Sequence, residues 1–374
     1  MGRMGLTAIA TVLGMTLAAT AGFADVIRIG VSAPKSGPQA GAAGAVYWPS
    51  IELWAQQVNE AGGIDVGGEK MPVELVEYDD KSTPEEAVKN MQRLITQDQV
   101  DFIAAPYTTG INLATAALIA KAGYPQIVAT GNLNELEPFV AKWPNSFWLL
   151  GRASDLSTGI VGTMTELRDA GKIGNRIALV HVADAFGLEM MASGKPAFEA
   201  AGFEVVYETS YPLGTQDLAP VVSGAMGADV DAFVAYSYPP DSFALTEQAQ
   251  VQGFNPKVFY VGVGGALTGY GQRFGAAAEG IMAMGGVNSD DPSYAAFREK
   301  HIAVTGVEPD YWASPVVYAS MEILAQAITT VGSLDRAAVI AEIQTGTFET
   351  AIGTVAFDNN IAGQVWTVGQ WQDG

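Results

Sequence analysis

The sequence contains no cysteine and only two histidines, His181 and His301. A chain without cysteine has no disulfide bonds, no thiol nucleophile and no cysteine-ligated metal. Two histidines leave little material for a catalytic centre built on imidazole. Glycine-rich phosphate loops of the GxxxxGK[ST] form and GxSxG nucleophile elbows are also missing from the sequence. These absences already argue against the commonest classes of enzyme.

Positive charge is scarce as well. The 374 residues include 19 Lys+Arg against 40 Asp+Glu, which gives a net charge of −21 and a pI near 4.3. A surface this acidic repels phosphate backbones and anionic lipids, so we expect neither nucleic acid nor a membrane surface as a partner. Hydrophobic residues nevertheless make up 49% of the chain, enough for a large packed core. The sequence predicts a folded, soluble monomer.

The N-terminus has the pattern of a secretory signal peptide. Arg3 is the only charged residue before Asp25, residues 6–21 are apolar, and Ala24 ends a stretch of small residues suited to cleavage. The apolar run of about 15 residues is shorter than the ~20 that a membrane-spanning helix needs. We expect residues 1–24 to be removed after Ala24 and the remainder to be exported to the periplasm.

Strand and helix patterns alternate over most of the remaining chain. Short β-branched runs such as residues 26–31, 73–77, 102–105, 126–129, 177–182, 232–236 and 257–261 are separated by amphipathic stretches that end at glycines. This alternation is typical of α/β proteins with parallel sheets covered by helices on both faces. About eight such units exceed one open sheet, so we infer two α/β domains. The last part predicts helices over 312–330 and 336–344, then a hairpin pairing 354–357 with 365–368.

Candidate catalytic groups are isolated from one another. Residues 262–265 (GVGG) lack the third glycine of a dinucleotide loop, and Asp79 and Asp80 are adjacent, so they point to opposite faces of a strand. We therefore expect no enzymatic activity, no metal and no cofactor.

Polar and aromatic side chains instead gather where the predicted strands end. In open α/β sheets the loops at the carboxyl ends of the strands line the ligand crevice. These loops contain Lys35, Ser36, Tyr107, Thr108, Thr109, Thr130, Gly131, Asn132, Phe186, Tyr236 and Tyr238. Hydroxyls and free N–H groups at helix starts suit an anion or a carboxylate, and aromatic rings suit an apolar or cationic body.

The sequence also resembles the periplasmic solute-binding proteins of the leucine/isoleucine/valine-binding type, the type I class that serves ABC importers. The matching segments are SGP at 36–38, VNEAGGI at 58–64, EYDD at 77–80, YTT at 107–109, TGN at 130–132, ASD at 153–155, AFG at 185–187, AEG at 278–280 and PDYW at 309–312. They extend over essentially the whole exported chain.

The resemblance implies a type I periplasmic-binding-protein fold, with two parallel-sheet lobes joined by three crossings and closing on a small ligand. The crossings are expected near residues 149–153, 280–285 and 352–356. The N-terminal lobe would then comprise residues 25–150 plus 281–353, and the C-terminal lobe residues 151–280 plus 354–374.

The resemblance further implies that Thr108, Thr109, Thr130 and Asn132 hold the ligand's polar groups, with Phe186 and Tyr238 facing them from the other lobe. One position departs from the family, because Gly264 stands where amino-acid binders carry an acid that pairs with the ligand's ammonium. Asp184 and Asp241 are candidate replacements for that acid. Lys35 and Arg152 are candidate cations that would favour a carboxylate.

These observations predict a periplasmic solute-binding protein that delivers a small amino acid or related organic carboxylate to ABC permease subunits in the inner membrane. Aromatic carboxylates, amides and quaternary ammonium compounds are the alternative ligands. A sensory ligand-binding module on the same fold is the alternative function.

Overall fold

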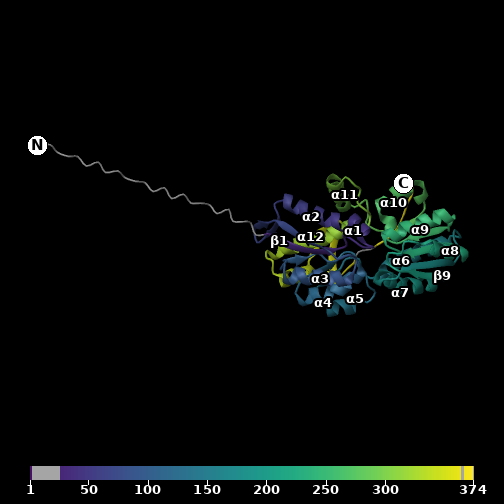
Figure 1. Ribbon diagram of the computed structural model, residues 1–374, viewed down its shortest axis with the longest axis horizontal. Helices are drawn as coiled ribbons and strands as arrows, with labels where there is room; N and C mark the ends of the chain where they lie inside the picture. The colour runs from purple at the N-terminus through teal and green to yellow at the C-terminus, as the bar shows by residue number, and fades with distance from the viewer. Residues whose placement is uncertain (2–25, 364–365, 374) are drawn as a thin grey trace.

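The computed structural model describes residues 1, 26–363 and 366–373. The predicted signal peptide, including its cleavage point at Ala24, lies outside the described residues apart from Met1. Two lobes lie next to each other (Figure 1), and the strand pairing assigns each part of the chain to one of them.

Lobe 1 contains two sheets, ordered β4-β1-β5 and β13-β14-β15-β7-β6, and a small hairpin, β2-β3. Its strands are β1 (Ile27–Ala33), β2 (Ile64–Val66), β3 (Glu69–Met71), β4 (Val73–Asp79), β5 (Phe102–Ile103), β6 (Gln126–Val128), β7 (Ser146–Trp148), β13 (Thr347–Thr350), β14 (Gly353–Asp358) and β15 (Ile361–Ala362). Its helices are α1 (Ala40–Val46), α2 (Trp48–Glu60), α3 (Pro84–Thr96), α4 (Thr109–Lys121), α5 (Leu136–Lys142), α11 (Pro292–Thr305), α12 (Ala313–Val331) and α13 (Arg336–Thr345).

Lobe 2 is built on one six-stranded sheet, ordered β16-β12-β11-β10-β8-β9. Its strands are β8 (Arg176–Val182), β9 (Glu204–Tyr211), β10 (Ala232–Tyr236), β11 (Val258–Val261), β12 (Met282–Met284) and β16 (Val368–Gln370). Its helices are α6 (Ala153–Asp169), α7 (Ala185–Ala200), α8 (Ala219–Gly227), α9 (Pro239–Gln252) and α10 (Thr268–Phe274), with short 3₁₀ turns η1 (Gly264–Ala266) and η2 (Gly275–Ala278). Both lobes have the predicted mixed α/β architecture with mainly parallel strands.

Local sequence signals explain where several helices begin and end. The Thr83 hydroxyl caps α3 by accepting a hydrogen bond from the backbone N–H of Glu86 (3.3 Å), and Pro84 occupies the first helical position. α9 ends at Gly253, whose φ of +71° is a left-handed conformation that glycine adopts without strain.

The chain crosses between the lobes three times: after β7, after β12, and between β15 and β16. The predicted second and third crossings were placed too early in the sequence. β12 pairs with β11 of lobe 2, and β14 pairs with β13 and β15 of lobe 1. Residues 281–285 therefore belong to lobe 2, and residues 354–362 to lobe 1.

The predicted hairpin between 354–357 and 365–368 is wrong, because the first segment belongs to lobe 1 and Val368 belongs to lobe 2. Asn359 and Asn360 form a two-residue turn with φ of +49° and +63°, and this turn pairs β14 with β15. Val368 instead begins β16 and pairs with Met284 in lobe 2.

Within the described part of the chain, no single helix has the length and apolarity to cross a membrane. Only α12 and α13 taken together pass that test, across a bend of 111°.

Candidate functional site

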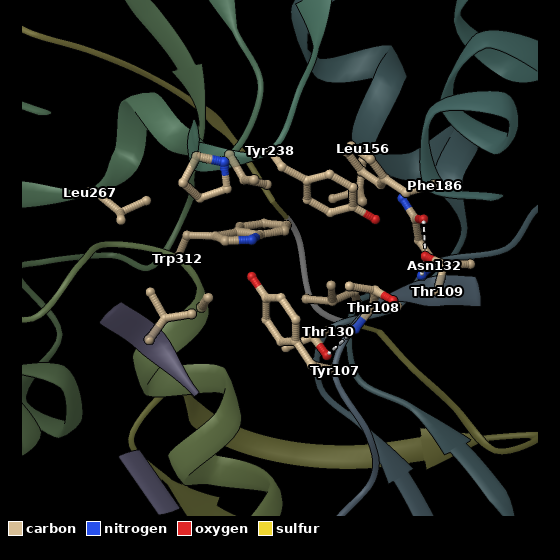
Figure 2. A pocket seen from close by; sticks show the side chains of 16 residues that line it. Tyr107, Thr108, Thr109, Thr130, Asn132, Leu156, Phe186, Tyr238, Leu267 and Trp312 are labelled. Carbon is tan, nitrogen blue, oxygen red and sulfur yellow. Dashed lines mark hydrogen bonds between the residues drawn. The ribbon is translucent and has the colours of Figure 1, made fainter. Parts of the chain in front are cut away.

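A cavity of about 530 Å³ lies between the two lobes, at the carboxyl ends of the central strands. The residues that line it come from both lobes and from the segments that join them: Val46, Tyr107, Thr108, Thr109, Thr130, Gly131, Asn132, Leu150, Leu156, Phe186, Tyr238, Pro239, Val263, Leu267, Trp312 and Ala313. None of these side chains is charged. Figure 2 shows Thr108, Thr109, Thr130 and Asn132 gathered on one side.

Two loops of lobe 1 form that polar side and hold each other in place. The Thr130 hydroxyl accepts a hydrogen bond from the backbone N–H of Thr108 (3.2 Å). The Thr109 hydroxyl donates to the side-chain oxygen of Asn132 (3.1 Å) and accepts from its backbone N–H (3.2 Å). These bonds tie the start of α4 to the loop that follows β6.

Thr108 adopts a backbone conformation that is rare for any residue except glycine, with φ +72° and ψ 153°. This conformation turns the chain sharply into α4, whose first N–H groups have no partner inside the helix. A helix N-terminus carries a partial positive charge, so this end of the cavity attracts an anion although no cationic side chain lines it.

Two stacked aromatic rings from lobe 2 form the opposite wall. Phe186 and Tyr238 lie with their centroids 5.0 Å apart and their planes tilted by 35°. The Tyr238 hydroxyl donates to Asp184 (2.9 Å), and Asp184 also caps α7 by accepting from the backbone N–H of Gly187 (3.1 Å). The Tyr238 ring is therefore fixed by a half-buried carboxylate that does not line the cavity.

A second carboxylate, Asp241, lies beside this ring at the start of α9. It accepts from the backbone N–H of Tyr238 (3.3 Å) and is almost completely buried. Burial, reinforced by the negative charge of Asp184, raises the pKa of Asp241 to about 7.

The raised pKa predicts a pH dependence of stability. Folded Asp241 holds its proton more tightly than unfolded Asp241, so its contribution is fully present below about pH 4 and is lost as the pH rises toward 7. We expect Asp241→Asn to match the wild type in unfolding free energy near pH 4 and to exceed it by about 2–4 kcal/mol at pH 8. Denaturant unfolding at both pH values measures this difference. A constant difference between the two proteins would contradict the assignment.

Eight of the thirteen predicted site residues lie on the cavity wall: Tyr107, Thr108, Thr109, Thr130, Gly131, Asn132, Phe186 and Tyr238. They come together because the loops at the carboxyl ends of the strands in both lobes face the space between the lobes.

The two predicted cations do not line the cavity, because acidic residues hold them elsewhere. Lys35 pairs with Glu77 (2.6 Å), and its ammonium lies 4.2 Å from the centre of the Trp48 ring. Arg152 pairs with Glu137 at the surface.

Three further predicted residues also lie off the wall. The Ser36 hydroxyl donates to Asp79 (2.6 Å). Tyr236 is fully buried behind the wall, with its hydroxyl against Gly194. Gly264 is packed so closely against α9 that a Cβ there would lie 2.4 Å from the Cβ of Ser242.

Sequence reasoning missed the apolar part of the wall, above all Trp312. This residue lies within the PDYW segment used for the resemblance, but nothing in its local pattern places it at the cavity. Its ring packs edge-on against Trp366 with centroids 5.1 Å apart, and Trp366 donates to the carbonyl of Leu150 (3.1 Å). The segments that join the lobes thus close one side of the cavity.

Comparison with known proteins places this architecture in a family. The family model described as "Periplasmic binding protein" matches residues 26–374. Leu/Ile/Val-binding protein homolog 3 of Brucella melitensis is 24% identical over 96% of both chains. A solute-binding protein from Rhodopseudomonas palustris, solved with benzoate, superposes with a TM-score of 0.81 at 19% identity, covering 93% of this chain and 94% of that one.

The substrate-binding protein LivJ of Streptococcus pneumoniae, solved with isoleucine, superposes with a TM-score of 0.76 at 22% identity, covering 92% of this chain and 100% of that one. At these identities the solved structures establish the fold, and the family model establishes the membership. The chain belongs to the periplasmic binding protein family and has the fold of its solved relatives.

Proposed function

We propose that this protein captures a small organic carboxylate without an ammonium group, closes its lobes on it, and delivers it to an ABC permease in the inner membrane. The observation that carries the proposal is the cavity wall, which has no charged side chain and concentrates its polar groups at the start of α4. We further propose that the protein acts in the periplasm as a monomer.

The carboxylate seat is formed by the N-terminus of α4 and the hydroxyl of Thr108. That hydroxyl has no hydrogen-bond partner among the described residues, and the α4 backbone offers free N–H donors next to it. A carboxylate placed here gains charge-assisted hydrogen bonds without a cationic side chain.

An α-ammonium group finds no such partner. The nearby acids do not line the cavity: Asp184 accepts from the Tyr238 hydroxyl, and Asp241 accepts from the backbone N–H of Tyr238. An ammonium taken out of water without a counter-charge costs several kcal/mol. Related structures contain either isoleucine or benzoate, so the fold accommodates both ligand classes, and the uncharged wall favours the second.

The body of the ligand would lie between the aromatic rings. Phe186 and Tyr238 face it from lobe 2, and Tyr107 faces it from lobe 1. Flat rings stack well on such walls, so we propose an aromatic carboxylate. A ligand that contacts both lobes stabilises the closed form by its differential affinity for that form.

Direct contacts between the lobes contribute to closure without touching the cavity. Glu189 of α7 accepts hydrogen bonds from the backbone N–H (2.8 Å) and the side-chain amide (2.9 Å) of Asn134 in lobe 1. We expect Glu189→Ala to weaken aromatic-acid binding about three- to thirtyfold, because the closed form becomes less populated. Calorimetric titration measures the change.

The matched control is Glu199→Ala, an exposed acid on the same helix with no bond to lobe 1. The control should bind like the wild type. Equal affinity of all three proteins would show that this contact does not stabilise closure.

Thermal unfolding of the ligand-stripped protein tests the proposed ligand class. Aromatic acids, amino acids, amides and betaines are compared in parallel. A ligand at about a hundred times its Kd adds ~2.7 kcal/mol of stability and raises the midpoint by several degrees. We expect shifts with aromatic carboxylates. Shifts confined to amino acids would overturn the proposed ligand class. A separate uptake assay in cells lacking the protein tests the transport role. Unimpaired uptake of the identified acid by those cells would overturn that role.

A further inference from the structure

Two polar groups that line the cavity have no hydrogen-bond partner among the described residues: the hydroxyl of Tyr107 and the indole N–H of Trp312. Both side chains are about 95% buried, with exposed fractions of 5% each. A ligand that fills the cavity takes these two groups out of water, and each would then cost about 1–3 kcal/mol if it stayed unpaired. Their position on the wall therefore points to a partner supplied by the ligand.

The aromatic residues that pack against these two have their polar groups bonded to protein. Tyr47, whose ring packs edge-on against Tyr107 at 5.8 Å, donates its hydroxyl to the carbonyl of Ala105 (2.6 Å). Trp366, which packs edge-on against Trp312, donates its indole N–H to the carbonyl of Leu150 (3.1 Å). In each aromatic pair, the ring that lines the cavity is the one left unpaired.

The two unpaired groups lie away from the carboxylate seat. In Figure 2 the Tyr107 hydroxyl points toward the Trp312 indole, whereas Thr108, Thr109 and Asn132 lie on the other side of the cavity. The cavity thus has two polar ends, with the Tyr238 and Phe186 rings above the space between them.

The chemistry at this second end favours a neutral oxygen. The indole N–H only donates, while a phenol both donates and accepts, so a hydroxyl group can bond to both. Burial, reinforced by the negative charge of Asp310, raises the pKa of the Tyr107 hydroxyl, which therefore stays protonated. The Asp310 carboxylate, buried at the start of α12, also disfavours a second anion nearby.

We propose that the ligand is a hydroxylated aromatic carboxylate whose ring hydroxyl is held by Tyr107 and Trp312. This inference rests on the proposed function and extends it from the carboxylate to the opposite end of the ligand. A site built to hydrogen-bond a hydroxyl discriminates strongly against the analogue that lacks it.

Calorimetric titration of the ligand-stripped protein tests the inference with 3- and 4-hydroxybenzoate, the 3- and 4-methylbenzoates of similar shape, and benzoate. We expect one hydroxybenzoate to bind at least about tenfold tighter than its methyl counterpart. Tyr107→Phe and Trp312→Phe should each reduce that ratio to about threefold or less, because each removes one of the two groups that bond the ring hydroxyl.

Trp366→Phe is the matched control, because its N–H is already bonded to protein, and it should retain the full preference. Equal binding of hydroxy and methyl compounds, or a preference that survives both Tyr107→Phe and Trp312→Phe, would overturn the inference while benzoate binding still supports the proposed function. If no benzoate binds, both fail together.

Discussion

Replacing Tyr238 with alanine is expected to weaken the binding of an aromatic carboxylate at least tenfold, or about 1.4 kcal/mol. The Tyr238 ring is 6% exposed, stacks on Phe186 and forms the lobe 2 wall of the cavity. Its removal takes away the surface on which the ligand's ring packs and removes one of the hydrogen bonds that Asp184 accepts, leaving the bond from the backbone N–H of Gly187. Calorimetric titration measures the loss, and circular dichroism verifies that the variant is folded.

Tyr236→Phe is the matched control for this variant. Tyr236 is fully buried behind the wall, and its hydroxyl has no partner among the residues that the structure describes. The control should therefore bind with wild-type affinity. Unchanged binding by Tyr238→Ala, or a comparable loss in Tyr236→Phe, would show that the cavity has been assigned to the wrong side of the β10–α9 connection.

Gly264→Ala is expected to destabilise the fold by about 2 kcal/mol or more, as overpacking of a tight core contact does. A Cβ at this position would lie 2.4 Å from the Cβ of Ser242 and 2.7 Å from the Cα of Pro239, and the second atom belongs to the backbone of α9. An acid at Gly264 would meet the same obstacle, so Gly264→Asp should destabilise the protein without creating amino-acid binding.

Gly269 in the neighbouring α10 provides the comparison. A Cβ at Gly269 has no atom within 4 Å, so Gly269→Ala should be neutral or stabilising by up to about 1 kcal/mol. Denaturant unfolding of both alanine variants measures the difference. Equal stability of the two variants would mean that the contact between η1 and α9 relaxes easily, and that Gly264 marks a lost acid rather than a packing requirement.

The sequence predicted the parts of the site that depend on strand order. Thr108 and Thr130 follow consecutive strands of lobe 1, and in α/β folds the loops at the carboxyl ends of the strands line the ligand crevice. The first crossing was expected from the family resemblance alone, and it lies between β7, which ends at Trp148, and α6, which begins at Ala153.

Contacts between distant segments were beyond the reach of sequence reasoning. Lys35 looks available in its loop, but its partner Glu77 comes from the neighbouring strand, 42 residues away. Trp312 directly precedes α12. It reaches the cavity only because the chain leaves lobe 2 after β12 and brings the start of α12 to the space between the lobes. Tyr236 and Tyr238 have the same spacing as alternate strand residues, but β10 ends at Tyr236, and only the turn into α9 directs Tyr238 into the cavity.

The proposed cleft binds a carboxylate at the start of α4 and offers no partner to an ammonium group. Calorimetric titration of the ligand-stripped protein with matched pairs tests this preference most directly, comparing 3-phenylpropanoate with phenylalanine and 4-methylpentanoate with leucine. Within each pair the body and the carboxylate are the same, and only the ammonium differs. We predict that the ammonium-free member of at least the aromatic pair binds at least about a hundredfold tighter. Tighter binding of phenylalanine or leucine would rule out an ammonium-free ligand class, because an ammonium group requires an acid that the cavity wall does not provide.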